Sequence, residues 1–205
     1  MDFHSRLIEE AVDQMASLPG IGRKTALRLV LHLLKRERED VDRFARAFTK
    51  LRNDICHCGI CNNLSDAEVC NVCTDNARDK HTVCVVESIR ELLAIEATQH
   101  YRGVYHVLGG VISPVEGVGP SDLSIEPLIA RCKVGDVKEV IFALSTTMEG
   151  ETTAFYLFRK LNDTGVNVSA IARGVAIGDE LQYADELTLA NSILRRQPYE
   201  ANLTR

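Results

Sequence analysis

The sequence predicts an α/β protein in several parts: a helical unit, a small cysteine-rich element, an α/β domain with a mostly parallel sheet, and a C-terminal helical segment. Three observations predict this order. Apolar residues first recur at helical spacing, then four cysteines stand in two pairs, and then short β-branched runs alternate with helical patterns. We expect the boundaries to fall at 1–55, 56–79, 80–178 and 179–205.

Composition and charge narrow the class of protein. The 205 residues are 45% hydrophobic and 26% charged, as in an ordinary globular protein. The longest apolar stretch, Leu27 to Leu34, is interrupted by Arg28 and His32 and is much shorter than the ~20 residues of a membrane span. Residues 1–10 lack the basic and apolar regions of a secretory signal. We therefore expect a cytoplasmic protein with no membrane helix.

The net charge of −5 is unevenly distributed. Residues 1–55 hold 11 Lys and Arg against 9 Asp and Glu, whereas the rest of the chain holds 13 against 20. The basic end and the acidic remainder could serve different partners, although charge that is simply solvated is an equally good interpretation of so small an excess.

Residues 1–55 show three helical periods, around 7–18, 25–35 and 41–55. Pro19-Gly20 ends the first helix. The stretch REREDVDR, residues 36–43, is expected to be a solvated connection, because alternating charges do not pack into a core.

The turn LPGIG joins the first two helices. Gly20 and Gly22 permit backbone N–H groups to face outward beside a helix N-terminus, a geometry that binds phosphate. Arg23, Lys24 and Arg28 follow at once and would contact a backbone without reading bases. A plain turn with solvated cations is the alternative. The pattern resembles the helix-hairpin-helix motif of non-specific DNA binders.

Two C-x-x-C pairs in CHCGICNNLSDAEVCNVC predict a zinc site. The expected ligands are Cys58, Cys61, Cys70 and Cys73. Cys56 with His57 offers an alternative to Cys58, and bystander thiols are the other interpretation. Four protein ligands leave no position for a catalytic water, so we expect one structural Zn²⁺ per chain.

The α/β domain is indicated by four apolar strand patterns, TVCVVE, VYHVLGG, EVIFALS and NVSAIA, with helical patterns between them. One more helix and a frayed end are expected after Leu187. Glu87 follows the first strand and Glu149 and Glu151 follow the third, and ligands of parallel sheets bind at those strand ends. This arrangement resembles a Toprim domain, in which such acids hold Mg²⁺. Here the usual Asp-x-Asp is missing and Ser145 and Thr147 are poor magnesium ligands, so any Mg²⁺ binding would be weak.

The order of these parts resembles the RecR family of bacterial recombination mediators over nearly the whole chain. The most specific stretches are LPGIGRKTALRL, CNNLSDAEVCNVC, VCVVES, the SP…GVGP loop and MEGETTA. The resemblance implies a homotetrameric ring that binds single- and double-stranded DNA without sequence preference. It implies a role at the nucleoid with RecO and RecF, helping to load RecA onto gaps coated by single-strand-binding protein.

The resemblance also assigns residues. It places DNA contacts at Lys24 and Arg28, and zinc at the four cysteines. It places the acidic patch that meets RecO at Glu87, Glu91, Glu149 and Glu151. Asp179 stands where the family more usually has a second glycine, which leaves the shape of that C-terminal turn open.

The sequence leaves two alternatives to a DNA-binding recombination mediator. One is a Mg²⁺-dependent Toprim nuclease or primase-like enzyme using Glu87, Glu149 and Glu151. The other is a zinc scaffold with no role in DNA binding. We expect no catalysis, since three dispersed glutamates specify an octahedral ion weakly.

Overall fold

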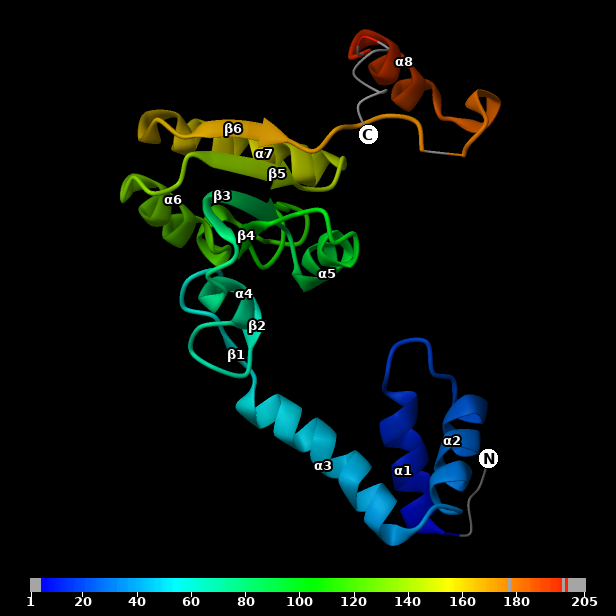
Figure 1. Cartoon of the computed structure of the whole chain (residues 1–205). Helices are drawn as coiled ribbons and strands as arrows, with labels where there is room; N and C mark the ends of the chain where they lie inside the picture. The colour runs from blue at the N-terminus through cyan, green and yellow to red at the C-terminus, as the bar shows by residue number, and fades with distance from the viewer. Residues whose placement is uncertain (1–4, 177, 197, 199–205) are drawn as a thin grey trace. The chain divides into compact units, whose positions relative to one another are not determined.

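The computed structural model describes residues 5–176, 178–196 and 198 (Figure 1). The chain divides into two compact units, residues 1–55 and 56–205. Among the described residues, no helix combines the length and apolar content that crossing a membrane requires.

The described part of the first unit, residues 5–55, holds three helices: α1 (Arg6–Ala16), α2 (Arg23–Leu33) and α3 (Arg38–Asp54). The first two pack against each other through Val12, Ala26 and Val30, which are almost fully buried. These residues lie on the apolar stripes that the helical periods predict, so the helix pair is confirmed.

The expectation that residues 36–43 form a solvated connection is wrong for most of that stretch, because α3 begins at Arg38. Its first turn carries Glu39 and Asp40, which the positive end of the helix dipole favours. Asp40 also pairs with Arg43 one turn further along. Charge alternation at i, i+3 and i, i+4 therefore supports an exposed helix as well as it supports a loop.

The apolar stripe of α3 has no buried residue among those described. Phe44 and Phe48 pack edge to face, with ring centroids 5.0 Å apart, yet Phe48 is 59% exposed and Leu51 is 55% exposed. The sequence therefore predicts the helix correctly, but α1 and α2 leave its apolar stripe exposed.

The second unit begins with the cysteine-rich element. Two short strands, β1 (Cys56–His57) and β2 (Leu64–Ser65), pair antiparallel, and the one-turn helix α4 (Asn71–Thr74) follows. The four cysteines at positions 58, 61, 70 and 73 form a cluster of buried side chains.

A four-stranded parallel sheet follows, as the sequence predicts, in the order β4-β3-β5-β6. The strands are β3 (Asp79–Val86), β4 (Gly103–Val107), β5 (Glu139–Ala143) and β6 (Asn167–Ala170). The helices between them are α5 (Ile89–Ala97), α6 (Ile125–Lys133) and α7 (Met148–Leu161).

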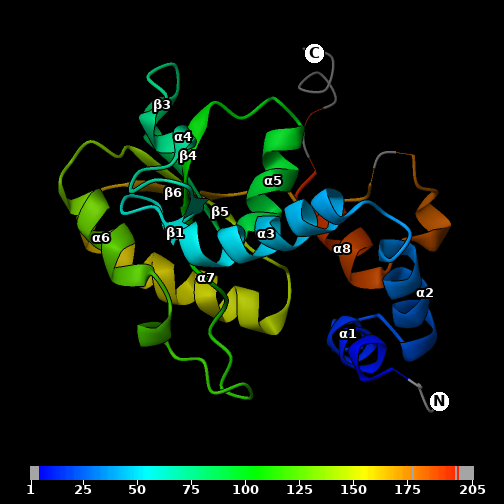
Figure 2. The same cartoon turned by 90° about the horizontal axis from the view of Figure 1, so that it is seen from below.

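Both faces of this sheet are covered (Figure 2). Val83 and Val85 of β3 pack with α6 and α7 in the larger core cluster. Cys84 and Val86, which alternate with them, pack with α5 on the other face. Burial on both sides explains why the strand sequences are continuous apolar runs.

The C-terminal segment contains the predicted helix, α8 (Glu186–Leu194), whose N-cap Asp185 accepts a hydrogen bond from the Thr188 amide. In the preceding turn Gly178 has a φ of +95°, and Asp179 does not have a positive φ. A second glycine at position 179 is therefore not required by this backbone. The frayed end expected after α8 falls at residues 197 and 199–205, which lie outside the described residues.

Candidate functional sites

The LPGIG turn has the backbone that its glycines predict. Gly20 has a φ of +79°, a region that side chains with a Cβ disfavour. Gly22 is the N-cap of α2 with an ordinary extended backbone, and a Cβ there would have no heavy atom within 4 Å. Ile21 packs into the α1–α2 core. Glycine at position 22 is thus explained by neither conformation nor internal packing, and it leaves the start of α2 open to a ligand.

The cations after the turn differ in their surroundings. Arg23 forms an ion pair with Asp13 of α1 at 2.9 Å, so it partly serves to join the two helices. Lys24 and Arg28 are exposed, and neither lies within 4.0 Å of a carboxylate in the part of the chain that the structure describes. Among the described residues, the two cations predicted to face phosphate thus have no carboxylate partner.

One feature of this face was not predicted from the sequence. A shallow hollow on α2 is lined by six side chains: Lys24, Leu27, Arg28, Leu31, His32 and Lys35. Lys35 lies seven residues after Arg28, so the helical spacing from Lys24 through Arg28 could have revealed it.

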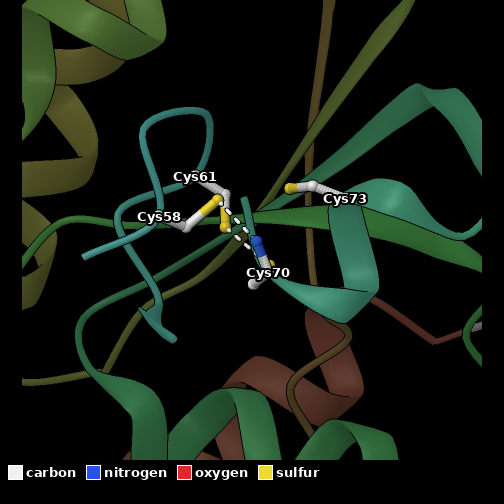
Figure 3. Close-up of side chains that lie close together, drawn as sticks. All are labelled: Cys58, Cys61, Cys70 and Cys73. Atoms are coloured by element: carbon white, nitrogen blue, oxygen red, sulfur yellow. Dashed lines mark hydrogen bonds between the residues drawn. The ribbon is translucent and has the colours of Figure 1, made fainter. Parts of the chain in front are cut away.

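The four predicted cysteines converge as metal ligands (Figure 3). Their sulfur atoms all lie within 4.8 Å of one another, and the side chains are at most 7% exposed. The Sγ atoms of Cys61 and Cys70 are 3.5 Å apart. Tetrahedral Zn²⁺ with bonds of ~2.3 Å places its sulfur ligands about 3.8 Å apart, so the cluster fits zinc.

The pKa values of Cys58 and Cys61 bear on whether this cluster needs a bound cation. Burial by itself raises the pKa of Cys58, but backbone amides that donate to its sulfur, including that of Cys70, lower the pKa to about 6. The shared hydrogen bond with Cys73, together with burial, raises the pKa of Cys61. Four buried thiolates cannot coexist without a compensating positive charge, which zinc supplies.

The structure resolves the choice between Cys56 and Cys58. The Cys56 thiol points to the carbonyl oxygens of Ser65 and Ala67, each 3.2 Å away, and His57 is exposed. Neither residue belongs to the cluster, so Cys58 is the first ligand.

The first zinc knuckle is attached to the sheet. The Val107 amide at the end of β4 donates to the Cys61 carbonyl at 2.8 Å, and the Asn62 side-chain amide donates to the Val107 carbonyl at 2.9 Å. Asn62 reaches this position with a φ of +60°, which asparagine tolerates better than most residues. Val72 of α4 also packs against the α5 side of the sheet.

The predicted acidic residues lie after β3 and β5, Glu87 directly at the end of β3 and the others in the first turns of α5 and α7, with different partners. A Glu87 carboxylate oxygen accepts from the Ser145 amide at 2.5 Å, which links the loops that follow β3 and β5. Glu91 caps α5 by accepting from the Ser88 amide at 2.8 Å. Burial raises the pKa of Glu91, but these Ser88 hydrogen bonds outweigh burial and hold it below its usual value.

Glu149 and Glu151 lie in the first turn of α7, where the helix dipole favours carboxylates. Glu151 forms an ion pair with Arg173 at 2.6 Å. Within the described ranges, the four cysteines are the only group of three or more His, Cys, Asp or Glu whose ligand atoms converge within 4.8 Å. The three glutamates of the magnesium hypothesis are therefore not brought together as a metal site.

These parts define a class: a zinc-binding, helix-hairpin-helix protein that carries a Toprim-like α/β domain. Comparison with protein families agrees part by part. The helix-hairpin-helix of RecR matches residues 8–51, the four-cysteine zinc finger domain of RecR matches 55–75, the Toprim domain matches 81–172, and the RecR C-terminal region matches 174–197.

Curated relatives cover almost the whole chain. A recombination protein RecR of Porphyromonas gingivalis is 58% identical over 197 residues, which are 96% of this chain and 95% of the relative. The recombination protein RecR of Bacteroides thetaiotaomicron is 57% identical, over 95% of this chain and 95% of the relative. That of Flavobacterium johnsoniae is 54% identical, over 98% of this chain and 97% of the relative. The chain belongs to the RecR family, and the four cysteines are its structural zinc site.

Proposed function

We propose that this protein is a DNA-binding mediator of recombinational repair that works at the nucleoid. The observation that carries the proposal is the pair of exposed cations, Lys24 and Arg28, behind a glycine turn that opens α2. The turn would offer backbone N–H groups to one phosphate, while the two side chains neutralise its neighbours. Contacts of this kind act on single- and double-stranded DNA alike, since they do not reach base edges.

The proposal is tested by changing both cations. Lys24→Ala with Arg28→Ala should lower the slope of log K against log salt by about 1 to 2 per protomer bound, from roughly 0.7 to 0.9 per phosphate contact. The free energy of unfolding should change by only about 0.5 kcal/mol per exposed position. Lys50→Ala, an exposed lysine of α3, is the matched control. A folded double variant with the affinity and salt slope of the wild type would disprove this interface.

Gly22→Ala tests the turn itself. An alanine fits the φ of −76° and meets no atom within 4 Å, so only the cap preference is lost, about 1 kcal/mol or less. Its methyl group would stand where a phosphate approaches the amides. We expect weaker DNA binding from a folded protein, and unchanged binding would show that the turn is not a phosphate site.

We further propose that the chain forms a tetrameric ring with RecO and RecF as partners, and that Glu87, Glu91, Glu149 and Glu151 form the surface that binds RecO. These carboxylates lie at the strand ends and in the helix turns that follow them. Glu87 and Glu91 also accept hydrogen bonds from the chain's own amides, so Glu149 and Glu151 are the positions to change. Of these two, Glu151 also pairs with Arg173, so Glu149→Lys is measured alone as well.

Reversing Glu149 and Glu151 to Lys should weaken RecO binding in calorimetry and leave the fold intact. Glu126→Lys, on the exposed side of α6, is the control. Equal affinities for wild type and the reversed variant would exclude these positions from the interface.

The Toprim-like domain is proposed to be non-catalytic, with a magnesium-dependent nuclease or primase as the alternative. What supports the proposal is that Glu87 is engaged by the Ser145 amide and that the described carboxylates do not converge. Nicking that requires Mg²⁺ or Mn²⁺ and is abolished by Glu87→Gln would establish the enzyme instead. We also propose that the chain is divided into four parts, a helix-hairpin-helix unit, a zinc element, a Toprim-like domain and a C-terminal segment, at residues 1–55, 56–79, 80–178 and 179–205.

A further inference from the structure

We propose that the DNA site continues along α2 beyond Arg28, so that Lys35 binds a second phosphate and Leu31 contacts the deoxyribose between the two. This inference rests on the proposed function of the hairpin, and it names the part of DNA that the same face would hold: a length of one sugar–phosphate backbone.

Three of these side chains form one line along α2, and the fourth follows the end of the helix. At 100° per residue, Lys24, Arg28 and Leu31 fall within about 60° of one another. Lys35 stands two residues after Leu33, in the turn that ends the helix. Ala26 and Val30, which pack against α1, lie on the opposite side of the helix. The line therefore faces away from the core, and the same side chains line the hollow on α2.

Charge along this line is of one sign. No Asp or Glu occurs between Gln14 and Arg36. The two arginines beside the line have partners, since Arg23 pairs with Asp13 and Arg36 lies 3.7 Å from Asp40. Within the described part of the chain, Lys35, like Lys24 and Arg28, has no carboxylate within 4.0 Å.

The length of the line fits more than one phosphate. Lys24 and Leu33, the last residue of α2, are nine residues apart, about 14 Å along the helix axis, and Lys35 lies just beyond that end. One strand of duplex DNA presents a phosphate every ~3.4 Å along its axis, so the two lysines would reach different phosphates of one backbone. Lys35 therefore adds a contact instead of competing for the phosphate at the turn.

Leu27 and Leu31 are the apolar side chains of the hollow, and Leu31 is the exposed one. It is 43% exposed although it stands between cations, and the α1–α2 core does not include it. A cationic rim around an apolar floor matches a sugar–phosphate backbone, in which apolar C–H faces of deoxyribose alternate with anionic groups. An apolar peptide would leave the cations without partners, so charge complementarity favours DNA as the occupant.

Two single variants of the full-length protein separate the two contacts. Lys35→Ala should lower the salt slope by roughly 0.7 to 0.9, which corresponds to about a 5- to 8-fold loss of affinity at 0.1 M salt relative to 1 M. Leu31→Ala should weaken binding at least twofold without changing the salt slope, because no charge is removed. Lys50→Ala should match the wild type in both quantities.

The outcomes are distinguishable from those of the hairpin test. If Lys35→Ala keeps the wild-type affinity and slope while the Lys24 and Arg28 double variant loses them, the extension is wrong and the proposed function stands. If Leu31→Ala binds like the wild type, the deoxyribose contact is wrong. If all of these variants bind like the wild type, the DNA site itself lies elsewhere.

Discussion

Asn62 is predicted to hold the zinc knuckle on the sheet through two separable effects. Its side-chain amide donates to the Val107 carbonyl at 2.9 Å, and its backbone has a φ of +60°. Asn62→Ala removes the hydrogen bond and places a residue with a less suitable side chain in the left-handed region. Asn62→Gly removes the same bond but tolerates the backbone.

The magnitudes follow from these two terms. A hydrogen bond of this kind contributes about 1 kcal/mol, and an ordinary residue in the left-handed region costs about 1.5 kcal/mol. Glycine instead adds about 0.5 kcal/mol of unfolded-chain entropy. We expect the free energy of unfolding to fall by about 2.5 kcal/mol for Asn62→Ala and by about 1.5 kcal/mol for Asn62→Gly.

Urea unfolding followed by circular dichroism, with zinc present, measures both losses. Release of zinc to a chromogenic chelator should be faster in both variants and fastest in Asn62→Ala, because local opening precedes release. Equal losses for the two variants would refute the backbone argument. Losses below about 0.5 kcal/mol in both would show that the bond to β4 does not stabilise the knuckle.

Three further predictions concern the α/β domain. Gly150→Ala should destabilise by about 1 to 3 kcal/mol in urea unfolding despite its helical position, because a Cβ there would clash with the Ser145 carbonyl oxygen; a neutral effect would refute this tight contact. Burial lowers the pKa of His106 to about 4, below its unfolded value of ~6.5. The free energy of unfolding should therefore fall by about 1.4 kcal/mol per pH unit as the pH drops from ~6.5 to about 4, and stay level at lower pH. His106→Gln should lose that dependence, and an unchanged pH profile would assign it to another group. Arg78 is 15% exposed and donates to both carboxylate oxygens of Glu96, whose side chain is 28% exposed and also accepts from the Tyr105 hydroxyl. Arg78→Met should therefore cost about 2 kcal/mol, between the values for exposed and buried ion pairs, and adding Glu96→Gln should restore part of it. No recovery in the double variant would contradict the unpaired carboxylate as the cause.

Much of the site is encoded locally. The two C-x-x-C pairs specify the zinc ligands because each knuckle is a short turn that presents two thiolates to one ion. The LPGIG turn is equally local, since the positive φ of Gly20 and the helix that starts after Gly22 depend on neighbouring residues. Apolar runs likewise predicted the buried strands, because both faces of the parallel sheet are covered.

Other features were decided by contacts between distant residues. Cys56, the alternative to Cys58, lies outside the cysteine cluster because the antiparallel pairing of β1 with β2 turns its thiol toward Ser65. Arg23 forms its ion pair with Asp13 because α1 and α2 pack side by side.

The sequence by itself determined most of the helices and strands, the glycine turn and the zinc knuckles, because those depend on periodicity and on neighbours in the chain. The start of α3 at Arg38, within a stretch of alternating charge, is an exception. Only the tertiary structure decided that Glu87 bonds to the Ser145 amide and that the described glutamates do not converge on a metal. The same is true of the side of α2 that stays exposed, since packing against α1 buries the other side and Lys35, just after the helix, lines the same hollow as Lys24 and Arg28. Distances between residues far apart in the chain depend on how the elements pack, and spacing along the sequence does not contain them.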